Sequence, residues 1–99
     1  MKTIYKYVLQ EGPIFSFEMG KKVLIEVPGG SKVLTAALQG TDLVVWIAVA
    51  DTGVGAIRTF VLWGTGNEIN SDIGGQETLE YISTVQVSQG LVIHVFEQT

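Results

Sequence analysis

The residues best suited to bind a ligand form a short loop, Gly64, Thr65, Gly66 and Asn67. Its two glycines expose backbone N–H groups that can surround a phosphate, and Thr65 and Asn67 add side-chain hydrogen bonds. The same residues also fit a tight turn after a strand, because glycine adopts positive φ without strain. The third glycine and the following helix of a dinucleotide-binding motif are missing. We therefore treat the loop as a candidate ligand-binding site, with a simple turn as the alternative.

Arg58 is the only arginine in the chain. Its guanidinium can hold a carboxylate or a phosphate through two parallel hydrogen bonds, which makes it the first candidate for an anion contact. If the chain turns at residues 52–55, Asp51 becomes a diagonal neighbour of Arg58. The alternative is then an ordinary surface ion pair of small energetic value. The candidate ligand-binding set is thus Arg58 together with the glycine-rich loop.

His94 is the only histidine and lies between Ile93 and Val95. A catalytic histidine needs a nucleophile or a carboxylate within reach. Glu97 is close in sequence, but in a regular strand it faces the opposite side from His94. We therefore interpret His94 as a structural histidine and predict no catalytic residue. An enzyme that pairs His94 with a carboxylate is the weakest alternative.

Metal ions and cofactors have no recognisable site in the sequence. The chain has no cysteine, and one histidine cannot build a multi-histidine centre. Acidic residues gather between positions 68 and 80, but without the spacing of a calcium-binding loop. We predict no metal and no cofactor, and expect these carboxylates to keep a polar loop solvated.

The composition limits the kinds of partner. With 99 residues, the chain is predicted to form a single β domain over residues 1–99. Six Lys and Arg against ten Asp and Glu give a net charge of −4, without the basic face that nucleic-acid binding needs. The longest apolar run, residues 43–50, is far shorter than the roughly 20 residues of a membrane-spanning helix. We expect neither nucleic acid nor a membrane as a partner, and the absence of cysteine fits a cytoplasmic location.

Short apolar stretches with period-two alternation predict β-strands about ten residues apart, separated by turns such as residues 28–31 and 39–42. Residues 32–38 also fit the apolar stripe of a short helix, but the shortness of the run favours a strand. In the last strand but one, strict alternation places Tyr81 and Ser83 on the same face. The sequence thus predicts an all-β antiparallel sandwich or small barrel of seven to eight strands. The expected strands are residues 2–9, 15–19, 23–27, 32–38, 43–50, 56–63, 78–87 and 91–96.

Two runs that each carry a tryptophan, residues 43–50 and 56–63, are joined by a turn-rich segment and are predicted to pair as a central hairpin. The run at 43–50 is apolar on both faces, whereas a strand in a small two-layer domain usually has one wet face. With 46% hydrophobic residues, a chain of this size has little interior for both faces. We therefore predict a homo-oligomer, most simply a dimer, with Trp46, Trp63 or Phe96 at the contact. Stacking of a base or a sugar is the other use of exposed tryptophans.

Several segments, in the same order over nearly the whole chain, resemble a family of small proteins encoded by tailed bacteriophages and prophages. They are residues 2–7, 25–34, 43–46 with Asp51, 58–60, 63–69, 81–86 and 94–97. In many relatives the loop equivalent to 64–67 ends in histidine, where this chain has Asn67, and residues 12–23 are a longer segment here. The resemblance implies a phage setting and supplies no catalytic residue.

These features together suggest a non-catalytic, phage-encoded binding protein that occupies or sequesters a host component. That component is a host protein or a small nucleotide of host immunity, and the expected location is the host cytoplasm. The hypothesis rests on apolar strand pairs, two tryptophans and a glycine-rich loop without a catalytic constellation. The alternative is a structural or virion-accessory β protein of a phage particle.

Overall fold

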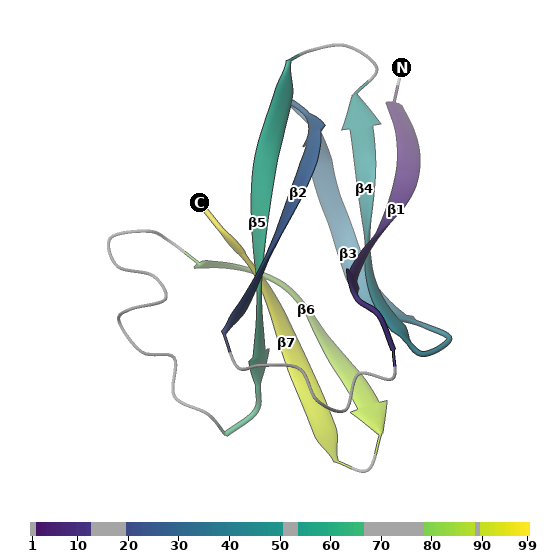
Figure 1. Cartoon of the computed structure of the whole chain (residues 1–99), viewed down its shortest axis with the longest axis vertical. Helices are drawn as coiled ribbons and strands as arrows, with labels where there is room; N and C mark the ends of the chain where they lie inside the picture. Colours follow the sequence, from purple (N-terminus) through teal and green to yellow (C-terminus); the bar gives the residue numbers. More distant parts are fainter. Residues whose placement is uncertain (1, 13–19, 51–53, 67–78, 89) are drawn as a thin grey trace.

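The structure, a computed structural model, describes residues 2–12, 20–50, 54–66, 79–88 and 90–99. Within these residues the chain forms strands and no helix (Figure 1), so no described helix could cross a membrane. The strands are β1 (Lys2–Gln10), β2 (Lys21–Pro28), β3 (Lys32–Gln39), β4 (Asp42–Ala50), β5 (Gly55–Gly64), β6 (Leu79–Ser88) and β7 (Leu91–Gln98). The strand expected at residues 15–19 lies outside the described part.

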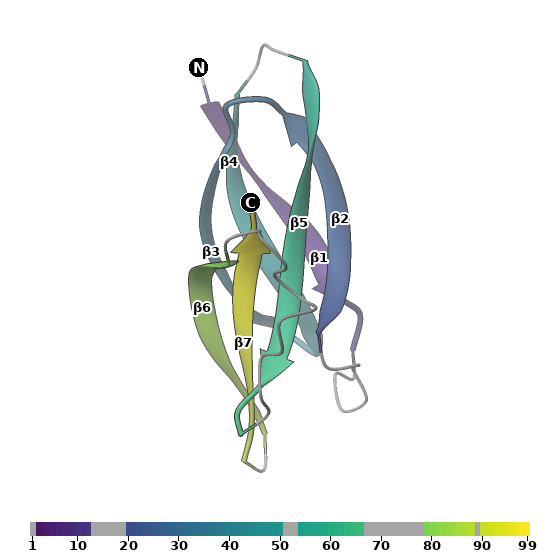
Figure 2. The same ribbon diagram turned by 90° about the vertical axis from the view of Figure 1, so that its left-hand side faces the viewer.

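The strands form two sheets that face each other (Figures 1 and 2). The first sheet has the order β1-β4-β3, and the second has the order β2-β5-β7-β6. Every hydrogen-bonded pair of neighbouring strands runs antiparallel. The prediction of an all-β antiparallel fold is therefore confirmed, and of its two forms the sandwich is observed.

The core lies between the two sheets and is filled from their central strands. Alternation along a strand sends every second side chain to the same face, so each strand contributes a row of apolar residues. The side chains with no exposed surface are Leu43, Val45 and Ile47 of β4, Phe60 and Leu62 of β5, and Ile93 and Val95 of β7. The middle of the core thus comes from β4 on one side and from β5 and β7 on the other.

The predicted central hairpin is wrong. The strand β4 pairs with β1 and β3, whereas β5 pairs with β2 and β7 in the opposite sheet. Both strands are apolar because each is flanked by neighbours on both edges and packs against the other sheet. Periodicity reports burial and not the pairing partner, and a crossover between sheets lets the two most apolar inner faces meet across the core.

Residues 32–38, whose pattern also fits a short helix, form the strand β3, as the shortness of the run predicts. The turn at residues 39–42 joins β3 to β4 as a hairpin, with Leu38 paired to Leu43. Gly40 has a φ of +62°, which L-residues with a Cβ adopt only with strain. Glycine at this position therefore allows the tight connection that brings β3 beside β4.

The strand β6 contains a bulge that breaks its alternation. Its register with β7 shifts between Tyr81 and Ser83, so that Tyr81 is opposite Phe96 and Ser83 is opposite Val95. Ser83 faces the core side, while Tyr81 packs edge-on against Phe96 on the outer face. The prediction that Tyr81 and Ser83 share a face is therefore wrong, because one extra residue in a strand reverses the facing of everything beyond it.

The outer faces of the two central strands are covered within the chain itself. On β4, Val44 is buried at 1% exposure, and Lys6 of β1 hydrogen-bonds Gln39 of β3 across the strand between them. The aliphatic stem of a lysine covers apolar surface well in such a position. On the other sheet, Val61 and Trp63 are buried in a small second cluster. Val44, Val61 and Trp63 are thus buried on the outer faces without a second copy of the chain, whereas Trp46 of β4 keeps some exposed surface.

Ser83 closes the sandwich along one side, where the edge strands β3 and β6 approach each other. Its hydroxyl oxygen accepts a hydrogen bond of 2.9 Å from the backbone N–H of Ala36, and it lies 3.0 Å from the Thr35 hydroxyl. Ala36 is buried, at 4% exposure, so its N–H has no access to water as a substitute. One serine hydroxyl therefore satisfies an edge-strand donor that no neighbouring strand can reach.

We expect Ser83→Ala to lower the free energy of unfolding by about 1–2 kcal/mol, because it leaves the Ala36 N–H buried without an acceptor. Gln86→Ala, at an exposed position of the same strand, is the control and should change it by less than about 0.5 kcal/mol. Urea unfolding followed by tryptophan fluorescence measures both. Equal stability of the two variants would show that Ser83 does not join the sheets.

Candidate functional site

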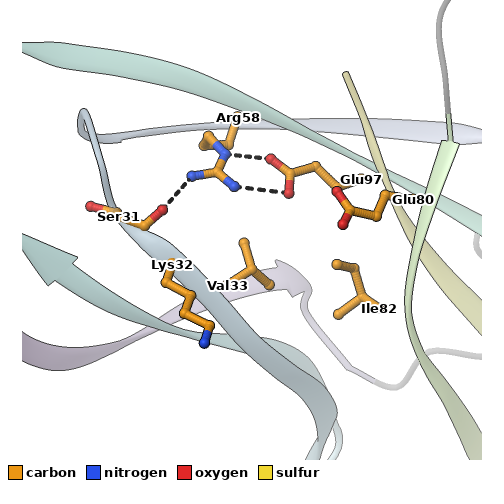
Figure 3. Close-up of a pocket in the computed structure, with 7 residues that line it drawn as sticks. All are labelled: Ser31, Lys32, Val33, Arg58, Glu80, Ile82 and Glu97. Carbon is orange, nitrogen blue, oxygen red and sulfur yellow. Dashed lines mark hydrogen bonds and ion pairs between the residues drawn. The ribbon is translucent and has the colours of Figure 1, made fainter.

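Arg58 and Glu97 form an ion pair at one end of the space between the sheets (Figure 3). Both lie on inner faces, since Arg58 alternates with Phe60 on β5 and Glu97 alternates with Val95 on β7. Nε of Arg58 donates to Oε2 of Glu97, and Nη2 donates to Oε1 at 2.9 Å. The Glu97 side chain is only 6% exposed and that of Arg58 is 25% exposed. The predicted anion contact of Arg58 is thus made to a carboxylate of the chain itself.

Ser31 extends this pair to the opposite sheet. Nη1 of Arg58 donates to the Ser31 carbonyl oxygen at 2.7 Å. The Ser31 hydroxyl donates to the Pro28 carbonyl at 2.6 Å and accepts a long hydrogen bond of 3.4 Å from the Ala50 N–H. All three guanidinium nitrogens therefore have partners, and the group ties β5 and β7 to the start of β3 and the end of β4.

The pKa of Arg58 is raised above its usual value, first by its hydrogen bonds to Glu97 and then by the charges of Glu97 and Glu80, while partial burial opposes them. Because the pKa of Arg58 is raised on folding, its positive charge contributes fully to the free energy of unfolding below the ordinary arginine range. This contribution is lost only when the pH rises above that range. The guanidinium thus stays charged at and below the ordinary arginine range.

A cavity of about 270 Å³ lies beside the pair. Its lining consists of Ser31, Lys32, Val33, Arg58, Glu80, Ile82 and Glu97. Glu80 is the direct cross-strand partner of Glu97, and in Figure 3 the Lys32 ammonium points away from both carboxylates. The two carboxylates offset the two cations, so this cavity has no excess positive charge for a phosphate.

The predicted ligand-binding set does not form one site. Arg58 and Gly64 are six residues apart on the same strand, which separates them by about 20 Å at the usual rise of a strand. Asn67 and Asp51 lie outside the described residues. Among the described residues of the predicted set, Arg58 is paired with Glu97, and Thr65 meets the His94 ring.

Thr65 belongs to a row of four hydrogen-bonded side chains on the outer face of the four-stranded sheet. Its hydroxyl lies 2.6 Å from Nε2 of His94, whose Nδ1 lies 3.0 Å from the hydroxyl of Thr84. The Thr84 hydroxyl in turn lies 2.7 Å from that of Tyr81. We call Thr65, His94, Thr84 and Tyr81 the hydroxyl–imidazole row. It crosses from the end of β5 over β7 to β6.

Strand register explains why these four residues meet. Thr84 is the direct cross-strand partner of His94 on the neighbouring strand. The bulge of β6 places Tyr81, three residues earlier, on the same outer face as Thr84. On the other side, the Thr65 N–H donates to the Val92 carbonyl, which holds the glycine-rich turn against β7. The sequence pattern gave no signal for Thr84, because the bulge breaks the alternation that would relate it to Tyr81.

Aromatic residues adjoin the row. The Tyr81 ring, 58% exposed, meets Phe96 edge-on at a centroid distance of 6.1 Å and an angle of 72°. Trp63 is buried at 6% exposure and is the cross-strand partner of His94. Of the three residues predicted at a subunit contact, Trp63 therefore has little surface left, whereas Trp46 and Phe96 remain partly exposed.

The row offers hydrogen bonding and an imidazole whose side-chain partners, among the described residues, are hydroxyl groups. Both ring nitrogens of His94 are partnered by threonine hydroxyls, and Glu97 faces the core, as expected from alternation. A hydrolytic triad orients its histidine with a carboxylate, and here Thr84 occupies that position. The described residues contain no group of three His, Asp or Glu that could hold a metal ion.

We expect Arg58→Met to lower the free energy of unfolding by about 3 kcal/mol, because it leaves the buried Glu97 carboxylate without a cation. Glu97→Gln leaves a partly exposed guanidinium and should cost less, about 1 kcal/mol. The double variant should be more stable than the sum of the two losses predicts, by at least about 1 kcal/mol. Urea unfolding of the four proteins measures this cycle, and additive losses would mean that the pair is not coupled.

Comparison with known proteins adds a family and no activity. No curated protein and no solved structure matches the chain. One family model, described as a domain of unknown function (DUF7352), matches residues 1–99. Because that match spans the whole sequence, the chain belongs to the DUF7352 family.

Proposed function

We propose that this protein is a non-catalytic binding domain. It binds and sequesters a small polar molecule of the host through its hydroxyl–imidazole row. The single observation that carries the proposal is the continuous hydrogen-bonded chain from Thr65 through His94 and Thr84 to Tyr81. It lies on an outer sheet face, where the fold does not need it for burial. Binding sites typically fix their ligands with a few placed polar groups beside aromatic surface.

The length of the row indicates the size of the ligand. Its ends lie on β5 and β6, with β7 between them, so two strand spacings separate them, about 10 Å. A nucleotide is about this long, and its base can stack on the exposed Tyr81 ring. Stacking of this kind contributes about 1–3 kcal/mol per base. The site therefore suits a nucleotide better than a large protein partner.

The setting follows from the resemblance to small proteins of tailed phages and prophages. A phage protein that removes a nucleotide signal of host immunity needs affinity and no turnover. The features of this chain support that role, since the row provides contacts without a nucleophile–base–carboxylate set. The expected location is the host cytoplasm.

A screen of cyclic and linear nucleotides by thermal shift, followed by calorimetry of the hits, tests the proposal. We expect at least one nucleotide to bind, and Tyr81→Ala to weaken it about tenfold or more through the loss of stacking. The matched control is Tyr5→Ala, because Tyr5 is exposed to 54% but lies on the other sheet. Absence of binding throughout the panel, or equal effects of the two variants, would reject the proposal.

The second candidate, a structural or virion-accessory protein, is favoured by the outward face of β1. Ile4 and Val8 are 61% and 42% exposed there, on the face opposite the buried Leu9. The partly exposed Trp46 adjoins them on β4, opposite Lys6. We propose that this face also mediates the homo-oligomer. Mass spectrometry of purified particles distinguishes the roles, because a structural protein is present in stoichiometric amounts.

We expect light scattering at micromolar concentration to give a dimer mass or higher, and Val8→Lys to reduce it by placing a charge in the apolar contact. The control is Leu24→Lys, at a 63% exposed position of the other sheet, which should leave the mass unchanged. A monomer mass for the unmodified protein would exclude this assembly.

A further inference from the structure

The hydroxyl–imidazole row can place its hydrogen atoms in three arrangements, two of which form a continuous donor-to-acceptor chain. Neutral histidine carries one ring hydrogen, and each hydroxyl carries one, so four hydrogens serve three hydrogen bonds. In the first arrangement Tyr81 donates to Thr84, Thr84 donates to Nδ1 of His94, and Nε2–H donates to Thr65. In the second every bond is reversed and His94 carries its hydrogen on Nδ1. In the third, Tyr81 and Nδ1–H both donate to Thr84 and Thr65 donates to Nε2, so the chain is interrupted at Thr84. The hydroxyl hydrogen left over is that of Thr65 in the first arrangement, of Tyr81 in the second and of Thr84 in the third.

Tyr81 makes these two arrangements unequal. A phenol is a stronger hydrogen-bond donor and a weaker acceptor than an aliphatic hydroxyl, because its oxygen shares charge with the ring. The first arrangement uses Tyr81 as a donor, whereas the second uses it as an acceptor from Thr84. The third arrangement also uses Tyr81 as a donor, but it lacks the mutual strengthening of a chain in which Thr84 both accepts and donates. The chain therefore runs from Tyr81 toward Thr65, with His94 in its Nε2–H tautomer. The spare hydrogen is then on the Thr65 hydroxyl.

The Thr65 end is thereby rich in donors. Thr65 adjoins Gly66, whose φ of +88° turns the backbone at the end of β5. The N–H of Gly66 donates to no other residue in the described part of the chain. A hydroxyl and a backbone N–H side by side match the oxygen atoms of a phosphate or a carbonyl group. The Tyr81 end instead presents an exposed ring.

We propose that Tyr81, as a positioning residue, sets the direction of the row so that Thr65 donates to a phosphate oxygen, and that the ligand is a nucleoside phosphate with its base on Tyr81 and its phosphate at Thr65 and Gly66. This inference rests on the proposed function, and it specifies the class and orientation of the ligand. It also assigns a tautomer to His94 that exists without any ligand.

The tautomer is tested in the ligand-free protein by long-range ¹H–¹⁵N NMR. His94 is the only histidine, so its two ring nitrogens give the only such signals. At about pH 8.5, above the usual range of histidine titration, we expect the Nε2–H form to dominate. Tyr81→Phe should lower the ratio of Nε2–H to Nδ1–H about twofold, because Thr84 then loses the donor that strengthens its own hydrogen bond to Nδ1. Tyr5→Phe, the control, should leave it unchanged.

The ligand class is tested with adenosine 5′-monophosphate and adenosine as probes in calorimetry. The unmodified protein should bind the phosphate compound about tenfold more tightly, and Thr65→Val should abolish that difference, whereas Thr3→Val on the other sheet should keep it. A dominant Nδ1–H tautomer, a ratio insensitive to Tyr81→Phe, or equal affinity for the two probes would overturn the inference. An Nε2–H tautomer that responds to Tyr81→Phe, with no binding of any nucleotide, supports the direction of the row and rejects the proposed function.

Discussion

A carboxylate on the inner face of a sandwich strand loses its hydration, and the loss is tolerable only when a cation and further hydrogen bonds replace the water. Glu97 is in that position, and Arg58 meets it with two of its nitrogens. The third nitrogen bonds the Ser31 carbonyl, which belongs to the connection that starts the opposite sheet. The requirement of one buried charge thus holds β5, β7 and the start of β3 in fixed relation.

The same requirement explains how a small apolar core is closed at its margins. Leu43, Phe60 and Ile93 fill the middle of the core, but they do not fix the relative orientation of the two sheets, since apolar burial depends on area and not on direction. Directional hydrogen bonds at the borders of the core fix this orientation. They involve Arg58 and Ser31 at one end and Ser83 along the edge between β3 and β6. Polar contacts therefore specify how the sheets meet, while the core provides most of the free energy.

Local patterns in the sequence were sufficient for the strands and insufficient for their partners. Alternation located β3 and β7 closely, and glycine located the turn at Gly40, because these signals depend on neighbouring residues. The pairing of β4 and β5 could not be read in the same way, since two-sided burial is compatible with either sheet. The partner of Arg58 was likewise hidden, because Glu97 is 39 residues away and only the register of β7 brings it close.

The hydroxyl–imidazole row also depends on strand register, which local sequence patterns do not reveal. Thr65 and His94 were recognisable as polar residues, but the bulge of β6 decides that Tyr81 and Thr84 join them. Ordering exposed side chains costs conformational entropy, and hydrogen bonds at an exposed surface return little of it as stability. The ion pair at the sandwich end and the apolar core already account for how the sheets are held. The four-membered chain on the outer face therefore adds little to the stability of the fold, and this is the physical reason for proposing that it binds a ligand.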